Sequence, residues 1–180
     1  MKLIRRALPL LVLPTFFFGA GMLTAVVATG VARLIAPEPV TLLDAVAEGN
    51  YEAMFRMTSA GYDPGLPDVL KFSVLHWDRG EKTSPLLVAI GGGDINIIAY
   101  LTKHTTRLAE FPNDQALCIA ARYGHSNVAR HMMARGVPAV PRSGCDGTLN
   151  RPEDVAEKFD SQGLAKALRA YRLKRQASAD

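Results

Sequence analysis

Four stretches of the chain follow one pattern, and this repetition restricts the possible folds more than any other feature. They cover residues 41–61, 83–104, 113–136 and 151–171. Each holds a short apolar helix pattern, a break, and a second helix pattern. An alanine stands four residues before every break residue, and the pairs are Ala45 and Gly49, Ala89 and Gly93, Ala120 and Gly124, and Ala156 and Asp160. Glycine, and after it aspartate, accepts the left-handed conformation that ends a helix, so the pattern predicts four helix-turn-helix units.

The break residues are 44, 31 and 36 residues apart. A lone helix pair of this size cannot bury its apolar face, whereas stacked pairs share one continuous core. Small alanines at positions 45, 89, 120 and 121 would let neighbouring first helices approach closely. A generic helical bundle would also show amphipathic helices, but it would not require the fixed spacing from alanine to glycine. We therefore expect an all-α fold of stacked helix pairs.

Two of these stretches resemble ankyrin repeats, whose signature is T-P-L-H-x-A and whose period is about 33 residues. They are SPLLVAIGGGD (84–94) and ALCIAARYGH (116–125). The stretch LLDAVAEGN (42–50) is similar to an N-terminal ankyrin cap, and RPEDVA (151–156) to a C-terminal cap. No stretch has the signature histidine, and Glu153 replaces the signature leucine in the last one. The resemblance covers residues 41–171 and implies an ankyrin-repeat solenoid of about four repeats that binds another protein.

Two connections interrupt the repeat. Residues 62–82 form an insertion that adds about eleven residues to the ankyrin period, and Pro64, Gly65 and Pro67 mark turns in it. Its residues 69–77 are apolar enough for a strand or a short helix packed on the solenoid. Residues 137–150 are rich in turn-forming residues, and we expect an extended hairpin there.

Residues 7–32 are 26 consecutive uncharged residues. As a helix at about 1.5 Å per residue, this run exceeds the roughly 30 Å hydrocarbon core of a bilayer. We expect a transmembrane helix within residues 7–35, so that residues 1–36 act as a signal anchor and residues 37–40 as a linker. A signal peptide cleaved near Ala28 stays open as the alternative.

The charges around this run predict its orientation. Lys2, Arg5 and Arg6 precede it, and only Arg33 follows it closely. The positive-inside rule then places the N-terminus in the cytoplasm and the repeat domain on the periplasmic side of the inner (cytoplasmic) membrane, or in the periplasm after cleavage. Residues 37–180 contain equal numbers of basic and acidic residues, although a basic tail is expected at 172–180. The net charge of +4 therefore gives no argument for nucleic-acid binding.

The sequence contains no motif typical of catalysis, cofactor binding or metal binding, so we expect no enzyme activity, no cofactor and no small-molecule substrate. The glycines at 91–93 follow a helix pattern and lack the Lys-Ser/Thr of a phosphate loop, which indicates a helix end. His125 occupies a position at which ankyrin repeats use histidine to hydrogen-bond neighbouring backbone. Cys118 and Cys145 leave two alternatives: a disulfide, if the segment carrying Cys145 folds back, or a buried Cys118 with a surface Cys145.

The resemblance implies that the loop tips and the first-helix face contact the partner. These positions include Glu48, and the expected protein-binding residues are His76, Trp77, Arg79, Lys82, Asn113, Asp114, Arg122 and Tyr123. Packing of Trp77 against the solenoid is the alternative for that residue. The expected function is that of a non-catalytic, membrane-tethered envelope adaptor. The alternative is an immunity or inhibitor protein that neutralises a toxic enzyme in the periplasm.

Overall fold

The computed structural model describes residues 41–110, 112–142, 144–145 and 151–178. The chain divides into two units after Pro37, and all described residues belong to the second. They are mostly helical, which confirms the expected all-α class. The helices are α2 (Leu42–Ala47), α3 (Tyr51–Ser59), α4 (Pro85–Gly92), α5 (Ile95–His104), the 3-10 helix η1 (Asn113–Gln115), α6 (Ala116–Arg122), α7 (Ser126–Ala134), α8 (Pro152–Lys158) and α9 (Gln162–Ala177).

The predicted membrane segment at residues 7–35 and the linker at 37–40 lie outside the described residues. The alternative cleavage position near Ala28 lies outside them as well. Within the described ranges, no helix is both long and apolar enough to cross a membrane.

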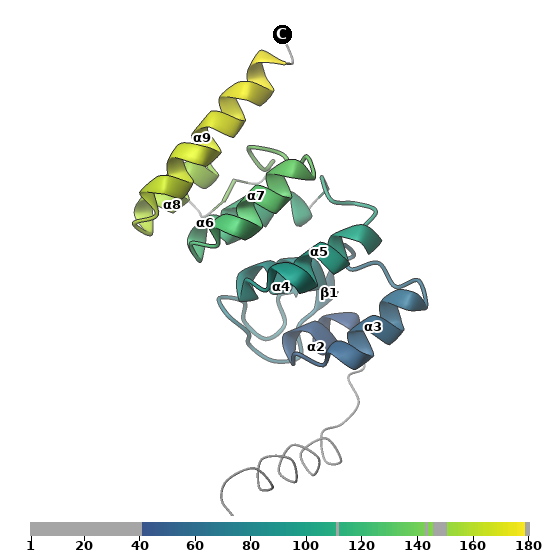
Figure 1. The fold of residues 1–180 in the computed structure, drawn as a ribbon. Helices are drawn as coiled ribbons and strands as arrows, with labels where there is room; N and C mark the ends of the chain where they lie inside the picture. Colours follow the sequence, from purple (N-terminus) through teal and green to yellow (C-terminus); the bar gives the residue numbers. More distant parts are fainter. Residues whose placement is uncertain (1–40, 111, 143, 146–150, 179–180) are drawn as a thin grey trace, which may run out of the picture. The chain divides into compact units, whose positions relative to one another are not determined.

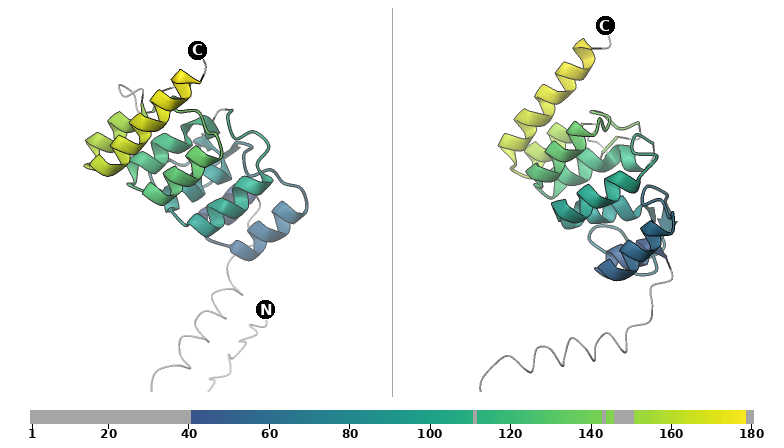
Figure 2. Two further views of the ribbon diagram at one scale, coloured as in Figure 1. Left: turned by 45° about the horizontal axis from the view of Figure 1, so that its top comes forward. Right: turned by 45° about the vertical axis from the view of Figure 1, so that its right-hand side comes forward.

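The helices form four consecutive pairs, α2 with α3, α4 with α5, α6 with α7, and α8 with α9. The first helices of successive pairs contact one another in chain order, and α7 contacts both α5 and α9. Figure 1 shows the four pairs side by side in this order, and Figure 2 shows the same succession from two further directions. The first helices supply much of one hydrophobic core, with Leu43, Leu86, Leu117 and Ala156 fully buried.

Each pair turns at the break residue that the sequence predicts. The backbone φ is positive at all four positions, with 68° at Gly49, 80° at Gly93, 67° at Gly124 and 57° at Asp160. In the third pair, the His125 amide donates to the carbonyl oxygen of Ala120 over 2.9 Å, and the first and fourth pairs have the corresponding bond. The spacing from alanine to break residue therefore recurs for a structural reason. The alanine carbonyl accepts a hydrogen bond that closes the turn, and the small alanine side chain lies in the core.

The insertion is closed by a two-stranded antiparallel sheet, in which β1 (Asp68–Val69) pairs with β2 (Lys82–Thr83). Between them, Val74 and Trp77 exchange two backbone hydrogen bonds of 3.0 Å. Leu75, inside this small turn, has a φ of 55°. The prediction of a strand or a helix over residues 69–77 is therefore wrong, because the chain reverses direction within that segment.

The segment that follows α7 folds back onto the third helix pair. Its described residues, 137–142 and 144–145, form bends and turns rather than paired strands. Cys145 forms a disulfide with Cys118 on α6, and their Cα atoms are 5.3 Å apart. Asp114 holds the same segment, because its Oδ2 accepts a hydrogen bond from the Arg142 amide over 3.0 Å. Of the two alternatives for the cysteines, the disulfide is the one found.

The last helix is also the longest. α9 contains 16 residues, and its buried side chains are Leu164, Ala165 and Leu168. From Leu173 onward its side chains are exposed. The residues expected to form a basic tail are, as far as Ala177, the last turns of this helix.

Candidate functional site

The tip of the insertion packs on the C-terminal end of α4. A Cβ atom placed at Gly91 would come too close to Cδ1 of Leu75 and would lie 3.5 Å from the Trp77 ring. A larger residue at this position would therefore make the exposed Leu75 side chain shift. The triple glycine at 91–93 therefore includes a packing site for the insertion, in addition to the turn at Gly93.

A hydrogen bond connects the insertion tip to the third helix pair. Nδ1 of His76 lies 2.9 Å from the hydroxyl oxygen of Tyr123, at the end of α6. The His76 ring also lies against the Trp77 indole, with a centroid separation of 3.9 Å. Burial raises the pKa of Tyr123 above its ordinary value, although the nearby Arg122 opposes this shift. The phenol therefore stays protonated at neutral pH and can donate its hydrogen to His76.

His125 contacts both α4 and the tyrosine that binds His76. Its Nε2 lies 3.0 Å from the carbonyl oxygen of Gly91, so the expectation that it bonds neighbouring backbone is confirmed. Its ring stacks on Tyr123 with a centroid separation of 5.9 Å. The imidazole thus fixes both the glycine end of α4 and the tyrosine that holds the insertion tip.

The same edge of the domain continues to the fourth helix pair. The Arg122 guanidinium lies 5.8 Å from the centre of the Phe159 ring, and the Lys158 ammonium lies 5.7 Å from it. Phe159 is 42% exposed and Leu75 is 50% exposed. We call this set the turn strip, because it follows the ends of α4, α6 and α8; its members are Leu75, His76, Arg122, Tyr123, Lys158 and Phe159.

Three of the predicted binding residues, His76, Arg122 and Tyr123, come together in the turn strip. Arg79 and Lys82 are exposed as expected but stand outside it. Lys82 belongs to β2 and lies opposite Val69 in the small sheet. Glu48 is an exposed residue at the end of α2 and also lies outside the strip.

Three other predicted residues are buried, so the expectation that they face a partner is wrong. Trp77 is 8% exposed, which confirms the packing alternative. Asn113 is fully buried, and its side-chain oxygen accepts a hydrogen bond of 2.6 Å from the Ser84 hydroxyl. Asp114 is 1% exposed and binds the Arg142 amide. The side chains of Asn113 and Asp114 stabilise the fold, because they supply hydrogen-bond partners to buried polar groups of the surrounding loops.

Leu75, Lys158 and Phe159 were not predicted. Leu75 looks like one more apolar residue of the insertion, and only its positive φ sets it apart. Phe159 directly precedes the break residue Asp160, a position where an apolar ring is not needed for the turn. The sequence offered one signal for Phe159, an aromatic residue just before a helix break. This signal indicates a surface site only when the neighbouring Arg122 is known from the structure.

The turn strip combines cations, aromatic rings and an exposed aliphatic side chain. Such a surface can attract carboxylates through Arg122 and Lys158 and contact apolar groups through the rings. Tyrosine and arginine are among the residue types that dominate interface energetics. Among the described residues, no group of three His, Cys, Asp or Glu side chains is placed to hold a metal ion. No protein-family model matches the chain, and no curated protein matches it in sequence.

Proposed function

We propose that the chain is a membrane-tethered ankyrin-repeat protein that binds a partner protein outside the cytoplasm through its turn strip. The observation that carries the proposal is the continuity of the strip. The insertion, α6 and the end of α8 contribute neighbouring side chains to one edge. A hydrogen bond joins His76 to Tyr123, and a cation-π contact joins Arg122 to Phe159.

The succession of helix pairs supports the ankyrin part of the proposal. The four pairs stack in chain order, and every pair turns at a residue with positive φ. Ser84, the residue at the N-cap of α4, also bonds Asn113 at the start of the next repeat. A side-chain bond between successive repeats at this position suits a repeat stack, in which each unit depends on its neighbours.

The disulfide supports a location of the domain outside the cytoplasm. Cys118 and Cys145 are paired, and disulfides persist mainly in oxidising compartments such as the bacterial periplasm. The uncharged run at residues 7–32, with basic residues before it, supports a tether whose C-terminal side leaves the cytoplasm.

The test is crosslinking in intact membranes, followed by capture of the full-length chain through a C-terminal tag. We expect one partner in stoichiometric amount with the parent chain, and loss of that partner with the double variant R122A/F159A. The matched control is L173A/K174A, because both residues are exposed on α9, away from the strip. All three proteins should give the same circular-dichroism melt.

The nature of the partner separates the two roles. An envelope component would indicate an adaptor, and a toxic enzyme would indicate an immunity protein. Equal capture by the parent and R122A/F159A would remove the strip as the binding surface.

A further inference from the structure

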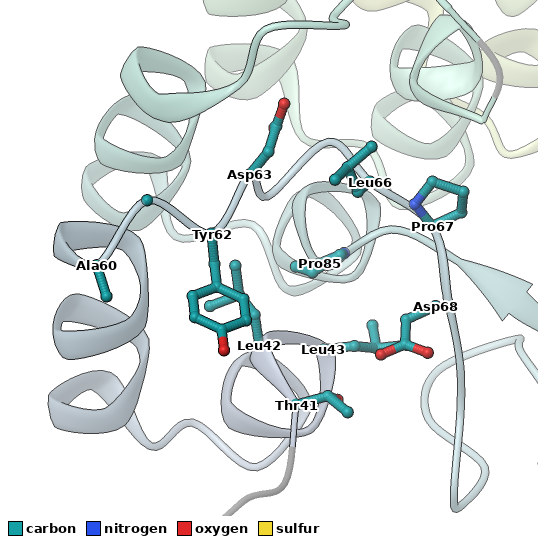
Figure 3. A pocket seen from close by; sticks show the side chains of 11 residues that line it. Thr41, Leu42, Leu43, Ala60, Tyr62, Asp63, Leu66, Pro67, Asp68 and Pro85 are labelled. Carbon is teal, nitrogen blue, oxygen red and sulfur yellow. The ribbon is translucent and has the colours of Figure 1, made fainter.

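A second surface lies at the other end of the first helices, at their N-termini. There the first residues of α2, the start of the insertion and Pro85 of α4 enclose a groove of about 440 Å³. Figure 3 shows Tyr62 on one side of this space, with Leu42 and Leu43 forming its floor and Asp68 at its rim. We call it the cap groove, since it belongs to the first repeat.

We propose that the cap groove binds a short peptide segment of a partner protein that presents a bulky apolar side chain next to a lysine or arginine. This inference rests on the proposed function in that it takes another protein as the source of the peptide. It concerns a surface separate from the turn strip, because the strip follows the C-terminal ends of the first helices.

The apolar character of the groove favours an apolar side chain. Tyr62 is 57% exposed and Leu66 is 47% exposed, although both line a concave surface. Leu42, Leu43 and Pro85 beneath them belong to the buried set, so a group that enters the groove meets the core directly. Concave apolar sites with a few polar groups at the edge are the usual form of a binding pocket.

The charges of the groove favour a cation. Asp63 and Asp68 are the charged residues of its lining, and none of the described lining residues is basic. Asp63 is already engaged, since its carboxylate accepts hydrogen bonds from the Gly65 amide and from Thr106. One oxygen of Asp68 accepts from the Val69 amide, and its carboxylate stands at the rim. An anionic ligand such as a phosphate would be repelled, whereas a lysine or arginine would be attracted.

The size of the groove restricts the occupant further. The volume lies at the lower end of the roughly 300–1,000 Å³ range of ligand clefts, which is enough for a few side chains and too small for a folded surface. A short, cationic and apolar peptide is therefore the occupant that fits both size and charge.

The test selects random peptides displayed on phage against the full-length parent chain held in lipid nanodiscs, with counter-selection on L66S. We expect a consensus that pairs a bulky apolar residue with lysine or arginine. By fluorescence anisotropy, the selected peptide should bind L66S at least about tenfold more weakly than the parent, and D68N about threefold more weakly.

Two matched controls should leave the affinity unchanged. L173S removes a similarly exposed leucine on α9, and D78N neutralises an exposed acid elsewhere in the insertion. An acidic consensus, no enrichment, or equal affinity for the parent and L66S would overturn the proposal. A proline-rich consensus that matches residues 37–40 would also overturn it, because the chain's own linker would then be the occupant.

Failure of the two proposals can be told apart. Loss of the membrane partner with R122A/F159A, but no peptide consensus, would leave the proposed function standing and refute the groove. A peptide consensus whose binding is weakened by L66S, together with no captured partner, would support the groove and refute the proposed function.

Discussion

At the scale of the residue, Gly93 combines a backbone requirement with a packing requirement. Its φ is 80°, and a Cβ atom there would lie 2.6 Å from the His125 ring. Gly49 has a similar φ of 68° but open space around the same position. We predict that G49A lowers the free energy of unfolding by about 1–2 kcal/mol, the cost of left-handed backbone alone. G93A should cost at least about 1 kcal/mol more, because His125 must move off Gly91.

Chemical denaturation of both variants measures this difference. Equal losses would mean that the imidazole moves aside freely, and would contradict its role as a support for the turn strip.

Asn113 is the second residue whose loss should be costly. Its side-chain nitrogen donates to the carbonyl oxygens of Gly65 at 2.8 Å and Arg107 at 3.0 Å, while its oxygen accepts from Ser84. We predict that N113A lowers the free energy of unfolding by about 2–3 kcal/mol, since buried carbonyls lose their donors. N127A, at an exposed position of α7, is the control and should change it by less than about 0.5 kcal/mol in urea denaturation.

His131 predicts a dependence of stability on pH. Burial, and then the charge of Arg135, lower the pKa of this histidine in the folded chain below its ordinary 6.5. The unfolded chain therefore takes up a proton first, so the stabilising contribution is complete above pH 6.5 and is lost as the pH falls through the folded pKa. Between about pH 7.5 and about pH 5.5, the urea midpoint should fall more for the parent than for H131Q.

H104Q replaces an exposed histidine on α5 and serves as the control for this pH dependence. It should follow the parent. A parent and H131Q that lose the same amount would show that other groups carry the acid sensitivity.

These residues show what sequence reasoning reaches at this scale. The break residues follow from a local rule, because positive φ restricts the residue types that can stand there, and all four positions were predicted. The burial of Asn113 and Asp114 was missed, because it depends on loops that come from elsewhere in the chain. From the sequence alone, an asparagine next to an aspartate predicts an exposed loop. In the structure Asn113 is buried and donates hydrogen bonds to two other loops.

At the scale of the element, α9 carries two ion pairs of different character. Arg172 pairs with Glu153, which is 1% exposed, at 2.6 Å, whereas Arg169 pairs with the exposed Glu157 at 2.5 Å. We predict that R172A lowers the free energy of unfolding by about 3–5 kcal/mol, because it leaves a buried carboxylate unpaired. R169A should cost less than about 1 kcal/mol.

Thermal and urea unfolding of these two variants, on one helix and with the same chemical change, check the prediction. A cost for R172A as small as that for R169A would mean that Glu153 becomes hydrated or neutral without loss. In the fourth helix pair, Arg172 thus compensates the charge of the buried Glu153.

The elements themselves were largely predictable, and the insertion was not. Helix pairs follow from apolar periodicity within each repeat, which is a local property. The insertion has apolar residues without a clear period, so neither a strand nor a helix could be preferred. Its real conformation depends on Gly91 and Tyr123, which lie outside it and become its neighbours only in the folded chain.

At the scale of the whole molecule, the disulfide ties the segment after α7 to the third helix pair. It closes a loop between residues separated by 27 positions. We predict that the double variant C118A/C145A, or reduction of the parent, lowers the free energy of unfolding by about 3 kcal/mol through the greater freedom of the unfolded chain. Reductant should lower the melting temperature of the parent but leave that of C118A/C145A unchanged. A parent that melts identically with and without reductant would contradict the pairing.

The contact between the insertion and α6 also determines the order in which the domain can be completed. His76 covers Trp77, and Tyr123, which holds His76, lies 47 residues further along the chain. A chain synthesised from its N-terminus at about 5–20 residues per second therefore lacks the hydroxyl that holds His76 for several seconds. During that interval the face of α4 that contacts α6 in the folded chain is uncovered as well. Completion of the first half of the domain thus waits for synthesis of the third helix pair.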